Sequence, residues 1–291
     1  MLDSIRITGI TGYGFHGVLD FERRDGQEFV VDLDIATPRV GLSAVNDDID
    51  RTLDYRDLLE RTHSIITGTP VALIETLAER IAASILDAGA SAVQVTVHKP
   101  KAPLTVPVSD VAVSVTRRRI RAVIGLGANL GEAGQALQQA AQAILELPRV
   151  TLVAASSIYR TTPISQIEQP DYCNGVLIVQ ADWDPASLLT QLHRIEAVFG
   201  RSRTQSMGPR TLDLDLIDAS DLDGPIVIDT ERCRVPHPRA AQRRFVLEPW
   251  AQIDPQGWLS WTGPVATLLA ALGADQGVEP TVEDLIPGVS H

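Results

Sequence analysis

The sequence predicts an α+β protein made of two successive domains, and three observations support this. Short segments alternate apolar and polar residues with the two-residue period of half-buried strands. Longer segments repeat apolar residues three and four positions apart, as amphipathic helices do. After a charged hinge of three arginines at 117–119, the whole pattern starts again. Because 291 residues exceed the needs of one small domain, we expect domains at 1–118 and 119–291.

The first domain is predicted to run β-β-α-α-β-β. Residues 28–35, 93–97 and 111–115 alternate apolar with polar side chains, which is typical of antiparallel strands with one buried face. Between the first two of these segments, residues 55–66 and 74–85 carry apolar side chains along one helical face. We therefore expect both helices to cover the same face of one antiparallel sheet.

The second domain also mixes strands and helices. Strands are expected at 122–126, near 151–158, at 175–181 and at 212–216, and a helix at 137–145. A second helix is expected to begin where Asp184 precedes Pro185. Aspartate is a favoured N-cap there, and proline suits the first helical position.

Composition excludes several classes of function. The net charge of −12 argues against a general basic surface for nucleic acid. Two cysteines, Cys173 and Cys233, rule out a disulfide framework and a cysteine-based zinc site. The first residues lack the basic and apolar regions of a secretory signal, and no apolar stretch approaches the length of a membrane span. We expect a soluble cytoplasmic protein without a nucleic-acid or membrane partner.

The basic residues are unevenly distributed. Lys99 and Lys101 are the only lysines, and nine of the arginines lie between Arg194 and Arg244. A general preference for arginine over lysine would explain the ratio of the two but not this clustering. An acidic chain that gathers its arginines in one window is expected to bind a polyanion there.

The first domain offers few side chains that could move protons. Lys99 ends a predicted strand, Tyr55 opens a helix, and Glu22 lies in a predicted loop. Glu75 lies beside the apolar face of the second helix. Taken singly, such residues are most often only solvated charges. Their significance therefore depends on the motifs around them.

Together these motifs resemble dihydroneopterin aldolase over nearly all of residues 2–117. They follow one another in this order: Tyr13-Gly14-Phe15-His16-Gly17, Glu22-Arg23, Gly26-Gln27, Leu53-Asp54-Tyr55, Leu73-Ile74-Glu75 and His98-Lys99-Pro100-Lys101-Ala102-Pro103. The resemblance implies the tunnelling fold, in which ββααββ subunits close into rings. It therefore implies a homo-oligomer, a tetramer or an octamer, held together through this domain.

The resemblance also assigns roles to individual residues. Glu75 would accept two adjacent N–H groups of a pterin, which a carboxylate can do with both oxygens. The pterin would also contact Leu53 and Ile74. Lys99 would transfer the proton, with Tyr55 as a relay and Glu22 orienting the lysine and a water. No cofactor is expected in this half, because the C=N bond of the dihydropterin can itself delocalise the carbanion.

The second domain contains a glycine-rich segment and a pair of aspartates. Residues 125–131 lack the G-x-G-x-x-G spacing of a dinucleotide site, and the chain has no P-loop motif. Asp213 and Asp215 would project from one face of a strand, roughly 6–7 Å apart at Cα. Such a pair is most often a solvated strand face, but it can also hold one or two Mg²⁺ ions. Nearby arginines favour the second interpretation, because their guanidinium groups can bind the phosphates that Mg²⁺ would accompany. These arginines are Arg201, Arg203, Arg210, Arg232 and Arg243.

The segment Gly208-Pro209-Arg210-Thr211-Leu212-Asp213-Leu214-Asp215 resembles hydroxymethyl-dihydropterin pyrophosphokinase. Further segments over about 121–255 carry the same resemblance: Gly127-Ala128-Asn129-Leu130, Tyr159-Arg160-Thr161, Gln169-Pro170-Asp171-Tyr172, Asn174, Arg194-Ile195-Glu196, Val235-Pro236-His237 and Phe245-Val246-Leu247. The resemblance implies a ferredoxin-like α+β domain.

Carried over by position, Asp213 and Asp215 bind two Mg²⁺ ions, with ATP as co-substrate. The residues that would hold the pterin are Tyr172, Phe245, Asn174, Thr161 and Ile164. The residues that would contact the nucleotide are Glu196, Arg203, Arg232, His237 and Arg243, and Arg201 and Arg210 would act in catalysis. Three residues depart from the family pattern and affect the segment that closes over ATP: His193, Thr204 and Met207.

The two resemblances imply consecutive reactions of folate biosynthesis. 7,8-Dihydroneopterin would be cleaved to 6-hydroxymethyl-7,8-dihydropterin and glycolaldehyde, and the pterin product would then be pyrophosphorylated by ATP, giving AMP. Three alternatives remain open from the sequence. One half could be only an assembly or pterin-binding module, the first domain could act mainly as an epimerase, or the arginine window could serve an anion-binding adaptor without turnover.

Overall fold

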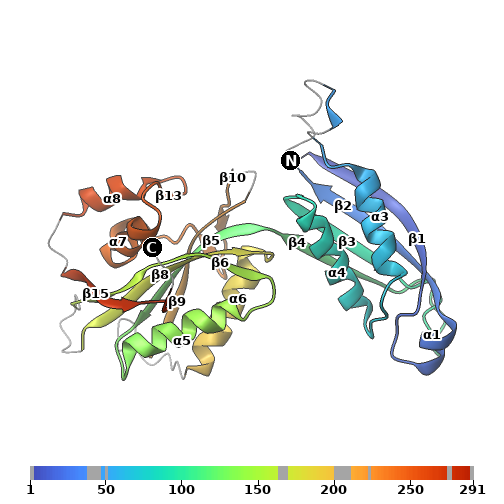
Figure 1. Ribbon diagram of the computed structural model, residues 1–291, viewed down its shortest axis with the longest axis horizontal. Coiled ribbons are helices and arrows are strands. Elements are labelled where there is room, and N and C mark those ends of the chain that lie inside the picture. The colour runs from blue at the N-terminus through green and yellow to red at the C-terminus, as the bar shows by residue number, and fades with distance from the viewer. Residues whose placement is uncertain are drawn as a thin grey trace. The chain divides into compact units, whose positions relative to one another are not determined.

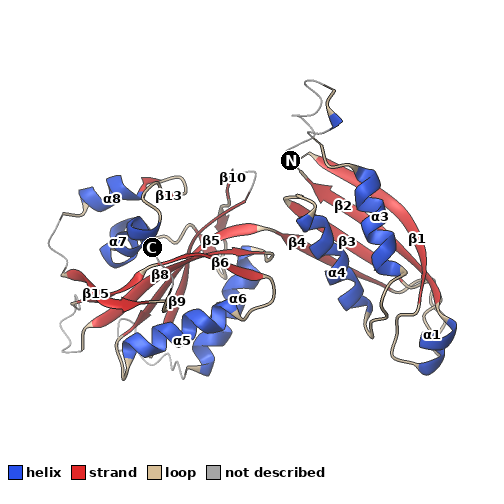
Figure 2. Cartoon of the chain, viewed as in Figure 1, coloured by secondary structure: helices blue, strands red, loops and turns tan. Residues whose placement is uncertain are grey.

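The computed structural model describes residues 3–37, 47–49, 52–162, 170–199, 211–221, 224–273 and 277–288. The chain folds into two compact units, Met1–Arg119 and Ile120–His291. Each unit has its own antiparallel sheet, its own helices and its own hydrophobic core (Figure 1; Figure 2). The predicted α+β class is therefore confirmed for both halves of the chain.

The first unit is a four-stranded antiparallel sheet with two helices on one face (Figure 1). Across the sheet lie β1 (Ser4–Gly14), β2 (Gln27–Ala36), β3 (Ala92–His98) and β4 (Ala112–Arg118). Between β2 and β3 the chain forms α3 (Tyr55–Ile66) and α4 (Ile74–Asp87), and the short helix α1 (Asp20–Asp25) joins β1 to β2. The ββααββ order is the predicted one, with α1 added where the sequence predicts a loop.

Alternation along β2 explains how this unit is held together. Phe29, Val31, Leu33 and Ile35 are all buried and pack against the inner faces of α3 and α4, whereas the residues between them are partly exposed. Helix α3 begins at Tyr55, as predicted. Its N-cap residue Asp54 accepts a hydrogen bond from the backbone N–H of Arg56 at 2.9 Å, so the first turn has a side-chain cap.

The arginine run at 117–119 is not a free hinge, which corrects the sequence prediction. Arg117 and Arg118 end strand β4, and the Arg117 guanidinium pairs with Glu79 of α4. Arg119 donates to the Asp87 carboxylate at 2.7 Å. These side chains are held by acceptors on α4, so the run belongs to the first unit.

The second unit is built on a seven-stranded sheet with the order β10-β9-β5-β8-β7-β15, in which β6 (Val150–Ala155) also pairs with β8. The two outer strands of this order are β10 (Gly224–Pro225) and β15 (Val278–Asp284). Its main strands are β5 (Ile120–Ala128), β7 (Ser157–Thr161), β8 (Tyr172–Ala181) and β9 (Asp213–Asp221). Helix α5 (Ala133–Leu145) follows β5, and α6 (Pro185–Val198) follows β8. This antiparallel βαββαβ arrangement is the predicted ferredoxin-like one.

One predicted strand is in fact two. The segment near 151–158 divides into β6 (Val150–Ala155) and β7, separated by the buried residue Ser156. The Ser156 hydroxyl accepts a hydrogen bond from the backbone N–H of Val176 at 2.9 Å. The backbone N–H of Ser156 donates to the Val176 carbonyl at 3.0 Å. Ser156 therefore interrupts the ladder with β8 and replaces it with a local pair of bonds.

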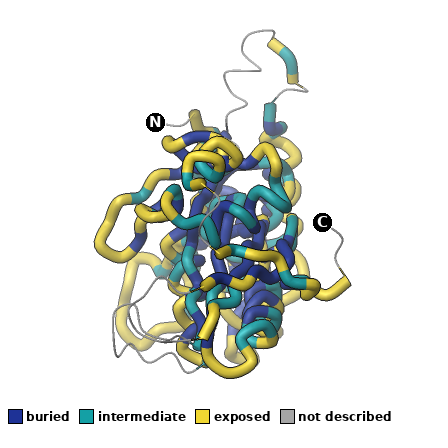
Figure 3. The backbone as a smooth tube through the Cα atoms, turned by 90° about the vertical axis from the view of Figure 1, so that its left-hand side faces the viewer, coloured by how far each residue is buried: buried dark blue, intermediate teal, exposed yellow. Residues whose placement is uncertain are grey.

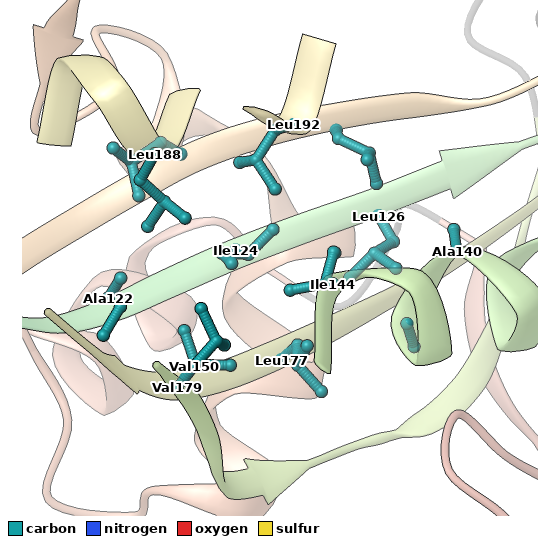
Figure 4. Close-up of a cluster of buried hydrophobic side chains, with 14 of the residues drawn as sticks. Ala122, Ile124, Leu126, Ala140, Ile144, Val150, Leu177, Val179, Leu188 and Leu192 are labelled. Atoms are coloured by element: carbon teal, nitrogen blue, oxygen red, sulfur yellow. The ribbon is translucent and has the colours of Figure 1, made fainter. Parts of the chain in front are cut away.

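Helices cover both faces of this sheet. Alternate residues of β5, namely Ala122, Ile124 and Leu126, face the cluster formed with α5 and α6, as Figure 4 shows. Val123 belongs instead to the opposite cluster, formed with α7 (Arg244–Ile253) and α8 (Val265–Ala271). Figure 3 shows that buried positions concentrate in the strands and helices, while the connecting loops are mainly exposed.

Short elements complete the second unit: β10 (Gly224–Pro225), β11 (Ile228–Asp229), β12 (Arg234–Val235), a 3₁₀ helix (Ala240–Gln242), β13 (Trp258–Leu259), β14 (Gly263–Pro264) and β15 (Val278–Asp284). Strand β15 pairs antiparallel with β7 at the edge of the sheet. Among the helices of the described ranges, none combines the length and the apolar character needed to cross a bilayer.

Candidate active sites

The first candidate site is formed around a buried ion pair. The Lys99 ammonium donates to Glu22 Oε1 at 2.5 Å, and the two side chains are only 12% and 2% exposed. Glu22 lies in α1, not in the loop that the sequence predicts, and Lys99 directly follows β3. Although these residues are 77 positions apart, the sheet brings them together, because β3 pairs with β2 up to His98 opposite Val30.

The Glu22 carboxylate is fixed on all sides. Its Oε2 accepts the backbone N–H of Leu19 at 3.0 Å, and Gln27 Nε2 donates to Oε1 at 3.4 Å. Gly17 makes this approach possible, because a Cβ atom there would lie 2.2 Å from Oε2. Burial by itself would raise the pKa of Glu22, but the hydrogen bonds from Lys99 and Leu19, with the Lys99 charge, outweigh burial and lower it. The Glu22 carboxylate therefore stays ionised at neutral pH.

An aromatic ring lies close to this pair and was missed by sequence reasoning. The Lys99 ammonium lies 6.0 Å from the centroid of the Phe29 ring, at the distance limit of a cation–π contact. Phe29 is fully buried on β2. In the sequence it is only one apolar position of an alternating strand, so no local signal distinguishes it from other core residues.

The predicted proton relay Tyr55 and the predicted pterin-binding residues of this unit lie at or just before the starts of α3 and α4. Tyr55 opens α3 and is 57% exposed, and Glu75 is an exposed residue in the first turn of α4. Ile74 is half-buried, whereas Leu53 belongs to the hydrophobic core. Within the described part of the chain, no hydrogen bond joins Tyr55 or Glu75 to the Glu22–Lys99 pair. Their predicted roles stay predictions.

The second candidate site lies on the α7 face of the other sheet. Asp213 of β9 pairs with Gly127 of β5, and Gly127 pairs on its other side with Asn174 of β8. Side chains of directly paired residues share a face, so Asp213 and Asn174 project to the same side across a glycine. Farther along the same face, Val176 and Ile217 pack against α7. Helix α7 covers the part of this face that carries Val176 and Ile217, and Asp213 and Asn174 lie on the adjacent part.

Two buried polar groups organise the β7–β8 side of this face. Asn174 Nδ2 donates to Thr161 Oγ1 at 2.9 Å. A Cβ atom at Gly127 would lie 3.2 Å from Asn174 Oδ1, so the glycine leaves room for the amide group. Tyr172, which pairs with Thr161, is half-buried at the start of β8. A glycine within a strand is a signal for close approach, and sequence reasoning gave Gly127 no role.

The α7 end of the face carries a cationic group opposite the aspartates. Arg243 donates to Asp215 Oδ2 at 2.7 Å and lies 5.6 Å from the centroid of the Phe245 ring. His237 Nε2 lies 3.8 Å from the same carboxylate oxygen. Burial lowers the pKa of His237, the charges of Arg243 and Arg239 lower it further, and Asp215 opposes them. The structure therefore brings Asp215, Arg243, His237 and Phe245 together.

The remaining predicted nucleotide residues differ in their surroundings. Glu196 of α6 is buried, and its Oε1 accepts the backbone N–H of Leu214 at 2.8 Å. This hydrogen bond connects α6 to β9 at Leu214, the residue between Asp213 and Asp215. Arg232 is exposed between β11 and β12. The predictions for Arg201, Arg203, Arg210 and Ile164 fall outside the described residues, as do the departures at Thr204 and Met207. The departure His193 is exposed on α6.

The aspartate pair on β9 has the donor chemistry of a magnesium site. Among the residues that the structure describes, no group of three or more histidine, cysteine, aspartate or glutamate side chains is arranged around one point. Asp213 and Asp215 supply partly exposed carboxylate oxygens from neighbouring positions of one strand face. Oxygen ligands few in number, completed by water and phosphate, are what Mg²⁺ takes in enzymes that act on nucleotides. The residues fit that ion.

Comparisons with known proteins match each unit separately. Residues 5–116 match the family described as dihydroneopterin aldolase, and residues 123–255 match 7,8-dihydro-6-hydroxymethylpterin-pyrophosphokinase (HPPK). The dihydroneopterin aldolase of Streptomyces coelicolor is 42% identical over 120 residues, which is 41% of this chain and 100% of the relative. The 2-amino-4-hydroxy-6-hydroxymethyldihydropteridine pyrophosphokinase of Pseudomonas aeruginosa is 38% identical over 151 residues, which is 52% of this chain and 91% of the relative.

A solved structure also matches the first unit. The E. coli dihydroneopterin aldolase in complex with neopterin has 29% sequence identity and a TM-score of 0.36. The match covers 40% of this chain and 99% of that chain.

Proposed function

The chain belongs to the dihydroneopterin aldolase family over residues 5–116 and to the HPPK family over residues 123–255, and from this premise we propose how one polypeptide performs both reactions. The first half is an aldolase that acts on 7,8-dihydroneopterin. The second half is a pyrophosphokinase that acts on the 6-hydroxymethyl-7,8-dihydropterin so produced. The two steps are consecutive in folate biosynthesis, and nothing favours the alternative that only one half is active.

The buried Glu22–Lys99 pair is the observation that supports the aldolase mechanism. Lys99 removes the proton from the substrate hydroxyl on the outer carbon of the breaking bond with the lone pair of its amine, and so becomes an ammonium. The electron pair left on that oxygen then forms the second bond of the glycolaldehyde carbonyl, the C–C bond breaks, and its electron pair is delocalised into the C=N bond of the pterin ring. The Lys99 ammonium then returns a proton, relayed by Tyr55, to the carbon that remains on the ring, which restores the amine. Glu22 holds the lysine in place and balances the positive charge while the lysine carries the proton.

Substrate binding in this half is proposed for residues at and before the starts of α3 and α4. Glu75 accepts the two adjacent N–H groups of the pterin, with Ile74 and the segment at Leu53 beside it, and Tyr55 relays the proton. The first unit exposes several large apolar side chains, including Tyr13, Val18 and Leu73. We propose that copies of this unit cover them in a tetramer or octamer, and that the enzyme acts in the cytoplasm. Mass photometry of the full chain measures the oligomer size.

The polar face of β9 supports the pyrophosphokinase mechanism. Asp213 and Asp215 would hold two Mg²⁺ ions, which when bound supply positive charge to the ATP phosphates. Arg243, held by Asp215 in the structure, is placed to exchange that carboxylate for a phosphate, and His237 and Arg232 would contact further phosphate oxygens. Asn174 and Thr161 would hydrogen-bond the pterin, and Tyr172 and Phe245 would stack on it.

One coupled assay tests the proposal. The full chain is supplied with 7,8-dihydroneopterin, ATP and Mg²⁺, and glycolaldehyde, AMP and the pterin products are measured together. We expect glycolaldehyde and AMP in proportion to the substrate consumed, because a pyrophosphoryl group is transferred. Formation of ADP would contradict the proposed transfer. An inverted triol side chain as the main pterin product would instead indicate an epimerase.

A further inference from the structure

We infer that His16 is a positioning residue of the aldolase site, because its buried imidazole fixes the α3–α4 connection to the end of β1. The inference rests on the proposed function, since it takes Glu75 as the pterin anchor and Glu22–Lys99 as the proton-transfer pair. The sequence places His16 in a motif but assigns it no task. The structure assigns it one through both nitrogens of its ring.

Both ring nitrogens of His16 bond to backbone groups of the α3–α4 connection. The side chain is 1% exposed. The backbone N–H of Val71 donates to Nδ1 at 3.1 Å, so Nδ1 carries no proton. The proton is therefore on Nε2, which donates to the Ile66 carbonyl at 2.7 Å. Because both partners are backbone groups with fixed roles, only this neutral tautomer satisfies them.

The electrostatic surroundings keep the ring neutral. Burial lowers the pKa of His16, and the nearby charges of Arg80 and Lys99 lower it further, against the hydrogen bond to Ile66. The described charged groups that lie nearest come from α4 (Arg80), from the end of β3 (Lys99) and from α1 (Glu22, in contact with Gly17). A neutral ring keeps its acceptor nitrogen for Val71 over the pH range in which the enzyme would work.

The segment held in this way leads to the predicted pterin anchor. Ile66 is the last residue of α3, and Val71 lies four positions before Glu75 in the first turn of α4. The Val71 carbonyl accepts the backbone N–H of Gly17 at 2.9 Å. Both backbone groups of Val71 are therefore bonded to His16 and Gly17. A displacement of this connection would move the start of α4, and Glu75 with it.

The same residue also supports the proton-transfer pair. The His16 ring packs edge-on against Phe29, with 5.1 Å between centroids and 69° between planes. Phe29 in turn lies 6.0 Å from the Lys99 ammonium. Through Gly17, the chain after His16 also closes over the Glu22 carboxylate. His16 thus contacts both the segment that carries Glu75 and the side chain beside Lys99.

Gly14 allows the close contact of His16 with the end of α3, because it has no side chain. A Cβ atom at Gly14 would lie 2.5 Å from the Ile66 carbonyl oxygen and 2.7 Å from His16 Cδ2. No other residue type would allow the end of α3 to come this close to β1. The histidine and the glycine two positions before it therefore form one arrangement.

Three substitutions in the full-length chain separate positioning from simple core filling. His16→Asn keeps an acceptor near the position of Nδ1 and loses the donor. His16→Gln keeps a donor near the position of Nε2 and loses the acceptor for Val71. His16→Leu loses both. The matched control is His63→Asn, an exposed histidine on α3. Each variant is assayed for glycolaldehyde release at varied dihydroneopterin, with thermal unfolding to verify folding.

We expect the acceptor for Val71 to matter most, because it controls the start of α4. His16→Asn and His63→Asn should keep the KM for dihydroneopterin near that of the parent. His16→Gln should raise KM about tenfold with a much smaller change in kcat, since misplacing a binding group costs substrate affinity. His16→Leu, if it folds, should raise KM at least as much. If it does not fold, the two amide variants still decide, because they differ in which bond they keep.

A folded His16→Gln variant with the parent's KM would overturn the inference, and so would an equal rise in KM for His16→Asn and His16→Gln. Glu75→Gln, measured beside them, separates this failure from failure of the proposed function. If Glu75→Gln leaves KM unchanged, Glu75 is not the anchor and both proposals fall. If Glu75→Gln raises KM and His16→Gln does not, only the positioning role of His16 is wrong.

Discussion

The two candidate sites are assembled in opposite ways. Glu22 and Lys99 come from different elements 77 positions apart, and both side chains are largely buried. Asp213 and Asp215 come from one strand, and the Asp215 side chain is 31% exposed. The first site is complete as a charge pair in the isolated chain. In the second site, the partly exposed Asp215 carboxylate pairs with Arg243 at the place where the charged phosphates would bind.

This difference suits the two chemistries. Moving one proton over a short distance needs a pair whose partners are already in place and shielded from water. Binding a triphosphate needs many charges that can exchange partners when the ligand arrives, which partly exposed side chains do more readily. The five predictions below test whether the two sites are as independent and as different as this comparison implies.

The largest effect is expected for Asp213→Ala. Loss of one of the two carboxylates should reduce AMP formation roughly 10⁴-fold, because metal charge contributes several kcal/mol to phosphoryl transfer. Glycolaldehyde release should stay near the parent rate, since the aldolase residues lie in the other unit. Asp229→Ala, a change at an exposed aspartate of the same unit, is the control. Loss of both activities in a folded Asp213→Ala protein would show that the units are not independent.

Lys99→Ala should affect only the first reaction. Glycolaldehyde release should fall roughly 10²–10⁴-fold, the usual size of a general acid–base contribution. Pterin binding should persist, because Glu75 is the proposed anchor. Lys101→Ala, at an exposed lysine two positions along, should be close to the parent.

The same lysine distinguishes proton transfer from covalent catalysis. Borohydride added with substrate should leave the parent protein unlabelled, since the C=N bond of the substrate makes a lysine imine unnecessary. Mass spectrometry of the treated chain measures this directly. A reduced adduct on Lys99 would refute acid–base catalysis by this residue.

Glu22 and Asp218 should make the stabilities of the two units depend on pH in opposite directions. Glu22 has a lowered pKa, so it stabilises the first unit above pH 4.5, and this contribution is lost as the pH falls through its lowered pKa. Asp218 of β9 is buried, and burial, opposed by its bonds to Ser260, raises its pKa from 3.8 to about 6. The folded state therefore binds more protons than the unfolded state between these values. The contribution of Asp218 to the free energy of unfolding of the second unit should therefore fall as pH rises from 3.8 to about 6.

Asp218→Asn tests this second contribution. The amide can still accept the hydrogen bond that Ser260 donates at 2.9 Å, but it carries no charge to bury. The variant should be more stable than the parent at pH 7 by about 1–3 kcal/mol, and the slope between pH 4 and 6 should flatten. All four tryptophans lie after Ile120, so their fluorescence during urea unfolding reports on the second unit. Equal free energies of unfolding for Asp218→Asn and the parent at pH 7 would contradict the raised pKa of Asp218.

The smallest effect is expected at the exposed arginines of the β11–β12 turn. Arg232→Ala should raise the KM for ATP roughly fivefold, because an exposed charge pair contributes about 1 kcal/mol. Arg234→Ala is the matched control, since Arg234 is already paired with Asp229 at 3.2 Å. An equal effect of both substitutions would indicate a general field of positive charge. No effect of Arg232→Ala would remove it from the nucleotide site.

Local patterns predicted most elements but not their pairing across the sheet. Alternation marked β2, β3 and β4, and the Asp184-Pro185 start of α6 was correct, with the Asp184 side chain accepting the Ser187 N–H at 3.0 Å. Helix α1 was missed because its six residues make less than two full helical turns. The division at Ser156 was missed because its cause is a hydrogen bond to a residue 20 positions away.

The candidate sites show the same limit. The D-x-D pair could be predicted, because residues two apart on a strand share a face whatever the rest of the chain does. The Glu22–Lys99 distance, the glycine between Asp213 and Asn174, and the bonds of His16 could not be derived from residue spacing. Each depends on which strands are neighbours and in which register.

The sequence by itself determined the class of the protein, the two-domain order and the residue types available for chemistry. Periodicity and capping act within a few residues, and motif resemblance needs no coordinates. Only the tertiary structure decided that the Glu22 carboxylate is buried against Lys99 and that Glu196 bonds to the backbone of β9. Burial and long-range hydrogen bonds depend on the packing of segments far apart in the chain. The pKa shifts of Glu22 and Asp218 follow from that packing and not from their neighbours in sequence.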